Sequence, residues 1–171
     1  MKKAYPVLSA FLLLLSCSKK ETESPKVYTL DPQCSKVIKL PGLTLPTAFT
    51  PNGDGKNDLY RPVVTQAAIE NFDLTVRRLN GEIVFQTNLI TKGWDGSDKN
   101  GVAATDYLYQ VSLKCKDAEG QLRDTCSYLY LLQGQNCINH VDGDVPKYWF
   151  EDQIDLGTGE FMYVTAENFC P

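Results

Sequence analysis

Apolar and polar residues alternate along several stretches of the chain, and this period of two is typical of a half-buried β-strand. Phe72, Leu74 and Val76 alternate with polar residues, and residues 107–115 and 126–132 continue the same alternation. Turn-forming Gly, Asn, Asp and Pro residues separate these stretches, and long helical periodicity is absent. The pattern predicts an all-β fold, an antiparallel β-sandwich over residues 27–134.

The first predicted hairpin turns at Asn80-Gly81, a dipeptide typical of a type I′ turn. With these two residues as the loop, the apolar residues of both strands lie on one continuous face. The predicted pairs are Leu74 with Thr87, Val76 with Phe85, Arg78 with Ile83, and Leu79 with Glu82.

The second predicted hairpin joins residues 107–115 to residues 126–132 through a loop at Gly120-Gln121. This loop sets Cys115 opposite Cys126, so we predict a Cys115–Cys126 disulfide. A strict two-residue loop would hold these Cβ atoms far apart, so we expect a bulge in the loop. The other predicted pairs are Leu113 with Tyr128, Val111 with Tyr130, and Tyr109 with Leu132.

Residues 135–171 are less regular, and they form an acidic, aromatic C-terminal extension. Residues 148–150 and 161–164 read as two further strands, joined by a turn near Gly157-Thr158-Gly159. We expect this extension to pack on the sandwich, tied there by Cys34, Cys137 or Cys170.

The first 16 residues have the layout of an export signal, because a basic start precedes a short apolar run. The apolar run is shorter than the roughly 20 residues that span a bilayer. Leu14-Leu15-Ser16-Cys17 resembles the lipobox of bacterial lipoproteins, which implies cleavage before Cys17 and lipidation of that residue. The alternative is an ordinary secretory signal with a chance cysteine. Residues 17–26 are polar and read as a flexible tether.

Composition narrows the class of protein further. The 171 residues carry a formal net charge of −4. Loss of Lys2 and Lys3 with the signal leaves 15 basic and 21 acidic residues, so the mature chain has a net charge of −6. Such a chain has no electrostatic basis for binding nucleic acid. Five cysteines follow Cys17, none in a zinc-type pair, and in an oxidising compartment they would form disulfides with one thiol left over.

Four motifs occur in a recognisable order: Leu45–Asp58, Asn80–Phe85, Gly93–Gly96 and Tyr107–Val111. This order strongly resembles the gliding motility-associated C-terminal domain, also called the type B sorting domain of type IX secretion, over residues 45–134. The resemblance implies an immunoglobulin-like β-sandwich and a secretion address. In that family the domain ends the chain of a non-lipidated cargo. Because residues follow Gly134 here and Cys17 precedes the domain, we expect the fold to transfer better than the sorting function.

The second half of the first motif has the composition of a calcium site. Asn52, Asp54 and Asp58 could supply side-chain oxygens on a tight glycine-rich turn. Lys56 stands where a calcium loop would place an acceptor, so the alternative is a turn whose Asn and Asp side chains bind their own backbone.

Two tryptophans are candidates for stacking on a sugar: Trp149 and Trp94, each with core packing as its alternative. His140 is the single histidine, and the neighbouring Cys137 is expected to be oxidised. The common hydrolase and phosphate-binding motifs are absent from the sequence, so we predict that the protein is not an enzyme.

The sequence thus predicts an outer-membrane lipoprotein of the bacterial cell envelope, facing the periplasm or exposed at the surface. Its expected role is a non-catalytic accessory or structural subunit linked to gliding or type IX secretion, with envelope or surface proteins as partners. The alternatives are a calcium-assisted carbohydrate-binding module with a glycan ligand and a type IX sorting domain.

Overall fold

Two β-sheets form the body of the protein in the computed structural model, which describes residues 29–34, 37–66, 68–133 and 148–162. The smaller sheet has the order β1-β2-β4, and the larger has the order β3-β8-β7-β5-β6. All pairs are antiparallel except β3 with β8. The predicted all-β sandwich is confirmed. The strands are β1 (Lys39–Leu40), β2 (Leu43–Thr44), β3 (Ala48–Phe49), β4 (Val63–Val64), β5 (Glu70–Arg78), β6 (Ile83–Thr87), β7 (Leu108–Lys116) and β8 (Leu122–Leu131).

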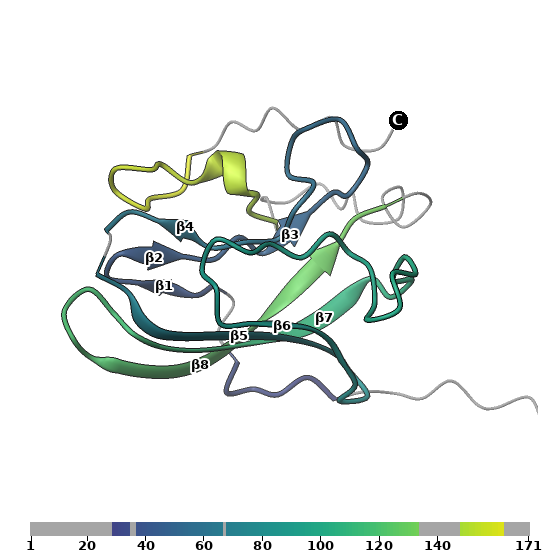
Figure 1. Ribbon diagram of the computed structural model, residues 1–171, viewed down its shortest axis with the longest axis horizontal. Coiled ribbons are helices and arrows are strands. Elements are labelled where there is room, and N and C mark those ends of the chain that lie inside the picture. The colour runs from purple at the N-terminus through teal and green to yellow at the C-terminus, as the bar shows by residue number, and fades with distance from the viewer. Residues whose placement is uncertain (1–28, 35–36, 67, 134–147, 163–171) are drawn as a thin grey trace, which may run out of the picture.

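The described chain forms four layers (Figure 1). The segment 29–34 lies on the outer face of the five-stranded sheet, the three-stranded sheet covers the inner face, and the segment 148–162 lies above the three-stranded sheet. The two ends of the described chain therefore lie on opposite sides of the sandwich. In the described segments, no helix is long and apolar enough to cross a bilayer.

Trp94 stands at the centre of the core, and its side chain is only 1% exposed. Its rings contact Phe49 and Tyr109, with centroids 5.3 and 5.0 Å apart. Two backbone hydrogen bonds of 2.8 and 2.9 Å also join Trp94 to Tyr60, which lies just after the first motif. Because a buried ring of this size contributes a large apolar area, Trp94 holds the Gly93–Gly96 motif and the first motif together.

The first hairpin partly follows its predicted register. Val76 faces Phe85 and Leu74 faces Thr87, as predicted. The predicted pairing of Arg78 with Ile83 is wrong, because a bulge next to Val76 places Arg77 opposite Ile83. The turn is also not type I′, since Gly81 has a positive φ of 91° whereas Asn80 does not.

The second hairpin differs from the prediction by an odd number of residues. Lys116 faces Leu122 and Ser112 faces Cys126, so the loop lies at residues 117–121 rather than at Gly120-Gln121. The Asp117 carboxylate fixes this loop by accepting hydrogen bonds from the backbone N–H groups of residues 119 and 121 and from Arg123 Nε. An odd shift exchanges the two faces of a strand. Residues 126, 128 and 130 therefore lie on the outer face, while Cys115 stays in the core.

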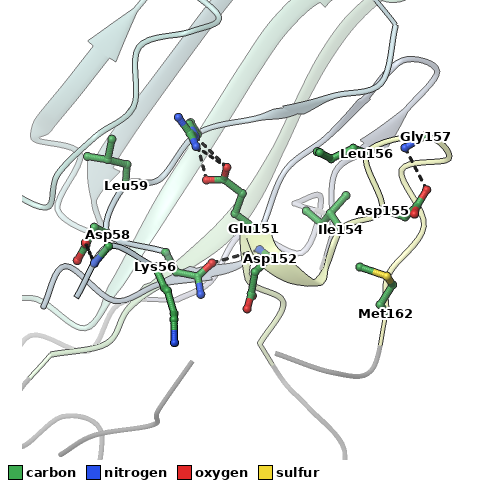
Figure 2. Close-up of a pocket in the computed structure, with 13 residues that line it drawn as sticks. Lys56, Asp58, Leu59, Glu151, Asp152, Ile154, Asp155, Leu156, Gly157 and Met162 are labelled. Carbon is green, nitrogen blue, oxygen red and sulfur yellow. Dashed lines mark hydrogen bonds and ion pairs between the residues drawn. The ribbon is translucent and has the colours of Figure 1, made fainter. Parts of the chain in front are cut away.

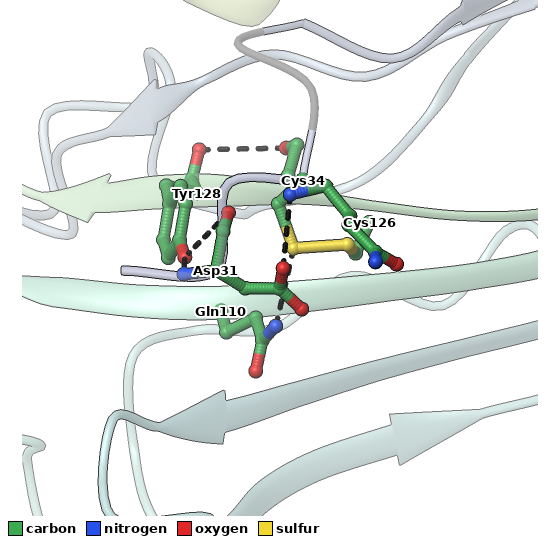
Figure 3. Close-up of a disulfide and its surroundings, with 7 residues drawn as sticks. Asp31, Cys34, Gln110, Cys126 and Tyr128 are labelled. Atoms are coloured by element: carbon green, nitrogen blue, oxygen red, sulfur yellow. Dashed lines mark hydrogen bonds between the residues drawn. A yellow bond between two sulfur atoms is a disulfide. The ribbon is translucent and has the colours of Figure 1, made fainter. Parts of the chain in front are cut away.

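The predicted Cys115–Cys126 disulfide is wrong for the same reason. Cys126 bonds to Cys34 across 92 residues of sequence, and Cys115 is a free thiol, 3% exposed. The bond fixes the segment 29–34 to the outer face of β8 (Figure 3). Two hydrogen bonds support it: Gln110 Nε2 donates to Cys34 Sγ at 3.2 Å, and Tyr128 OH donates to the Asp31 carbonyl oxygen.

Burial raises the pKa of the Cys115 thiol, so this cysteine is held in its unreactive form.

The C-terminal extension is less regular than predicted. Residues 148–150 are not a strand, and a short 3₁₀ helix, η2 (Glu151–Gln153), follows them. A single bridge joins Ile154 to Phe161 around the predicted turn at residues 157–159. The signal peptide, Cys17, the tether, Cys137, His140, Cys170 and residues 163–164 lie outside the described residues.

Replacing Cys34 with Ser should lower the free energy of unfolding by about 4 kcal/mol, because the disulfide closes a long loop of the unfolded chain. Chemical denaturation measures this loss. Tandem mass spectrometry of the alkylated, non-reduced protein checks the pairing: a Cys34–Cys126 linked peptide with Cys115 alkylated agrees with the structure, and a Cys115–Cys126 peptide contradicts it.

The Asp117 carboxylate should make the protein less stable in acid. Burial alone would raise its pKa, but the hydrogen bonds from Gln121, Arg123 and Glu119 lower the pKa below its ordinary value. A lowered folded-state pKa gives stability that is present above the unfolded value of about 3.9 and is lost as pH falls through the folded value. The Asp117→Asn variant should therefore melt several degrees below the wild type at neutral pH. Its melting temperature should approach that of the wild type once the pH falls below the folded-state pKa of Asp117.

The matched control for that variant is Asp124→Asn, because Asp124 pairs with Lys114 on the exposed surface, where both side chains are at least 65% exposed. Thermal melts from pH 2 to pH 8 should show little difference between this control and the wild type. A constant difference between Asp117→Asn and the wild type at every pH would show that the carboxylate charge has no role.

Candidate functional site

The described part of the extension covers the outer face of the three-stranded sheet. Thr44 Oγ1 donates a hydrogen bond to the Gly159 carbonyl oxygen at 3.1 Å, and Lys39 forms an ion pair with Glu160. Leu43 and Thr44 point to opposite faces of β2, yet each is only 1% exposed. Both faces of β2 are therefore covered, one by the core and one by the extension.

The extension also protects the edge of β3. The Trp149 carbonyl oxygen accepts hydrogen bonds from the N–H groups of Thr47 and Ala48, at 2.7 and 3.2 Å, and Trp149 N–H donates to Thr47 Oγ1 at 2.8 Å. Its ring packs against Phe161, with centroids 4.6 Å apart, and Trp149 is half-buried. An uncovered edge strand leaves backbone groups that can pair with strands of other chains. These bonds therefore cover the β3 edge of the five-stranded sheet.

The proposed stacking role fails for Trp94 and has not been tested for Trp149. Trp94 is buried in the core against the rings of Phe49, Phe85 and Tyr109, and its indole N–H donates to the Ser97 carbonyl oxygen at 2.6 Å. No face of this ring is open to a sugar, so the prediction for Trp94 is wrong. Trp149 already contacts another aromatic ring of its own chain.

The predicted calcium loop is held by its own side chains. Asp58 accepts hydrogen bonds from the N–H groups of Gly53 and Gly55, at 2.6 and 2.8 Å. The Asn52 side chain accepts a hydrogen bond from Asp54 N–H at 3.0 Å, and the Asp54 side chain accepts one from Lys56 N–H at 2.9 Å. The proposed ligand oxygens thus already hold backbone amides, which favours the turn interpretation. Calcium binding stays a prediction.

A cleft of about 770 Å³ lies between this loop and the extension (Figure 2). Asn57 joins the two sides, because its Oδ1 accepts the N–H of Asp152 at 3.2 Å. Asn57 has a φ of 47°, in the left-handed region that Asn adopts more readily than most residues. The lining residues are Gly55, Lys56, Asn57, Asp58, Leu59, Arg61, Glu151, Asp152, Ile154, Asp155, Leu156, Gly157 and Met162.

An ion pair between Arg61 and Glu151 crosses the cleft. Arg61 Nε and Nη2 donate to the Glu151 carboxylate at 2.7 to 3.0 Å, in the two-pronged geometry that suits a guanidinium. The hydrogen bond to Glu151 and its charge raise the pKa of Arg61. Arg61 therefore stays charged at physiological pH, and its ion pair with Glu151 neutralises that charge.

The remaining polar and apolar groups of the cleft have different roles. Asp155 accepts hydrogen bonds from the N–H and the hydroxyl of Thr158, and these lower the pKa of its carboxyl group. This carboxylate therefore holds a turn rather than a transferable proton. Leu59, Leu156 and Met162 are 38%, 73% and 43% exposed, so the cleft also presents apolar side chains to solvent.

Sequence reasoning missed this cleft. Arg61 and Glu151 are 90 residues apart, and neither belongs to a recognisable motif. The one available signal was the acidic and aromatic composition of the extension, which indicated packing on the sandwich but not its position.

Replacing Arg61 with Ala should loosen the extension without unfolding the sandwich. The pair is partly exposed, with side chains 46% and 25% accessible, so we expect a loss of only about 1 kcal/mol in global stability. Hydrogen–deuterium exchange should show faster exchange of the amides of residues 149–162. Lys114→Ala, which breaks the exposed pair with Asp124, is the control and should leave these amides unchanged. Equal exchange in both variants would contradict a local role for Arg61.

Comparison with known proteins supports the family resemblance of the sequence motifs. The family model described as CHU_C type IX secretion signal domain matches residues 43–137, which is more than half of the chain and includes both sheets except β1. The match begins in β2 and omits the extension that covers it. The comparison with curated proteins finds no match. The chain belongs to the CHU_C type IX secretion signal domain family, which links it to type IX secretion or gliding and to the cell envelope or the secreted fraction.

Proposed function

We propose that the protein is a lipid-anchored, non-catalytic interaction module of the bacterial envelope, linked to type IX secretion or gliding. The observation that carries the proposal is the lipobox-like Leu14-Leu15-Ser16-Cys17 on a chain that contains a type IX secretion signal domain. Eleven residues lie between Cys17 and Thr29, the first described residue. Fully extended, they reach roughly 40 Å, so an acylated Cys17 would keep the sandwich close to the membrane.

The position of the disulfide supports this arrangement. Cys34 and Cys126 hold the start of the described chain on the outer face of the five-stranded sheet, whereas the extension and its cleft lie on the far side of the sandwich (Figure 1). A tether that leaves from one face presents the opposite face to other proteins. A disulfide is also typical of exported proteins.

The cleft supports a binding role better than a catalytic one. Glu151 is paired with Arg61, Asp58 holds two backbone amides, and Asp155 holds a turn. Carboxylates in such positions are committed to structure, and general acid–base catalysis needs groups free to exchange a proton. The proposed role is therefore accessory or structural, with envelope or surface proteins as partners.

A second candidate function is a sorting signal for the chain itself, and the family match favours it. The two functions differ in what delivers the protein. An anchored accessory reaches its place through lipidation of Cys17, whereas a sorted cargo needs the type IX machinery. The carbohydrate-binding alternative has lost Trp94 as a platform, and the described structure offers no further observation in its favour.

The test combines a point variant with a secretion mutant of the native bacterium. Cys17→Ser should release the protein from the membrane fraction, because a stable anchor requires acyl chains on that residue. Intact-mass analysis of the native protein should show acylation at Cys17, and the protein should stay in the membrane fraction when the type IX translocon is deleted.

Each candidate function makes a different prediction in the secretion mutant. Accumulation of unanchored protein in the periplasm of the translocon mutant, with an unmodified Cys17 in the wild type, would support the sorting signal and contradict the anchored module. Ser24→Ala is a suitable control, because Ser24 lies in the tether outside the lipobox-like motif and the variant leaves the cysteine in place.

A further inference from the structure

The cleft is built from two parts of the chain with different origins. Leu59 and Arg61 directly follow the first motif and lie inside the family match, whereas Glu151, Leu156 and Met162 come from the extension outside it. The family-matched residues supply only one side of the cleft. The complete cleft therefore requires the extension, and its chemistry belongs to this chain rather than to the matched domain.

Apolar side chains gather at this cleft. Three of the nine large apolar side chains that are exposed in the described structure line it: Leu59, Leu156 and Met162. Figure 2 shows Leu59 at the side of the motif loop and Leu156 with Met162 on the extension, and Glu151 with its ion pair lies between them. Ile154, which is 2% exposed, lies among them and closes the interior of the cleft.

The charge of the cleft is negative. Asp58, Glu151, Asp152 and Asp155 stand against Lys56 and Arg61 among its lining residues, and Arg61 is neutralised by Glu151. Apolar contacts at two separate points, with carboxylates between and around them, complement a segment that carries apolar side chains and positive charge. The volume is in the range of sites that bind compact ligands or a few side chains.

We propose that this cleft is a docking site for an extended peptide segment of a partner protein, with two apolar side chains and at least one Lys or Arg. One apolar side chain would contact Leu59, the other would contact Leu156 and Met162, and the basic residue would approach the acidic lining residues Asp58, Asp152 and Asp155. This inference rests on the proposed interaction role and names the chemistry of the partner.

The test uses the chain from residue 18 to residue 171, which keeps every residue that the structure describes and needs no membrane. A phage-displayed library of random dodecapeptides is selected on the immobilised protein, and the enriched peptides are synthesised for titration. We expect enriched peptides to combine apolar residues with Lys or Arg, and to bind more weakly as the salt concentration rises.

Variants then locate the binding site. Leu59→Lys and Leu156→Lys place a cation in the cleft and remove an apolar contact, so each should weaken peptide binding at least tenfold. Leu122→Lys is the matched control, because Leu122 is 80% exposed at the start of β8, outside the cleft, and it should bind the peptide as the wild type does. Unchanged melting temperatures confirm that the substitutions at these exposed positions leave the fold intact.

Other results overturn the proposal. Failure of the library to enrich any sequence, enrichment of acidic or uncharged peptides, or binding that Leu59→Lys and Leu156→Lys leave unchanged would each exclude this docking site. These outcomes are independent of whether Cys17 is acylated, so a failure here is distinguishable from a failure of the anchored-module proposal.

Discussion

The packing of the C-terminal extension on the three-stranded sheet is the interaction on which the rest of this structure depends. Strands of two residues make too few hydrogen bonds to form a stable sheet without further contacts. Here β2 is buried on both faces, because the sandwich core covers one face and the extension covers the other. The extension also closes the edge of β3 through the Trp149 carbonyl oxygen. The residues that match the family are thus only part of the packed body.

This packing also places the cleft on the far side of the sandwich from the start of the described chain. The Cys34–Cys126 bond holds residues 29–34 on the outer face of the five-stranded sheet, and the extension lies beyond the opposite sheet (Figure 1). In the proposed anchored module, attachment and recognition are separated by the thickness of the sandwich. That separation suits an anchored protein whose free face contacts other components of the envelope.

Local sequence pattern predicted the strands well and the pairing of distant parts poorly. Alternation located β5, β7 and β8, and the apolar face fixed Val76 opposite Phe85. The errors in strand pairing arose at the turns. The Asp117 side chain holds the loop after β7, and the resulting odd shift turned Cys126 away from Cys115. Cys34, the true partner of Cys126, is 92 residues away, and connectivity over such a distance cannot be read from spacing.

The cleft was beyond sequence reasoning for a similar reason, since Arg61 meets Glu151 only when the extension folds back across the sheet. The most direct measurement of that arrangement is nuclear Overhauser spectroscopy on the isotope-labelled chain from residue 18 to residue 171. The structure predicts cross-peaks between the Trp149 and Phe161 rings, and between Trp149 and the amides of Thr47 and Ala48. Random-coil shifts across residues 148–162, without these cross-peaks, would contradict the account.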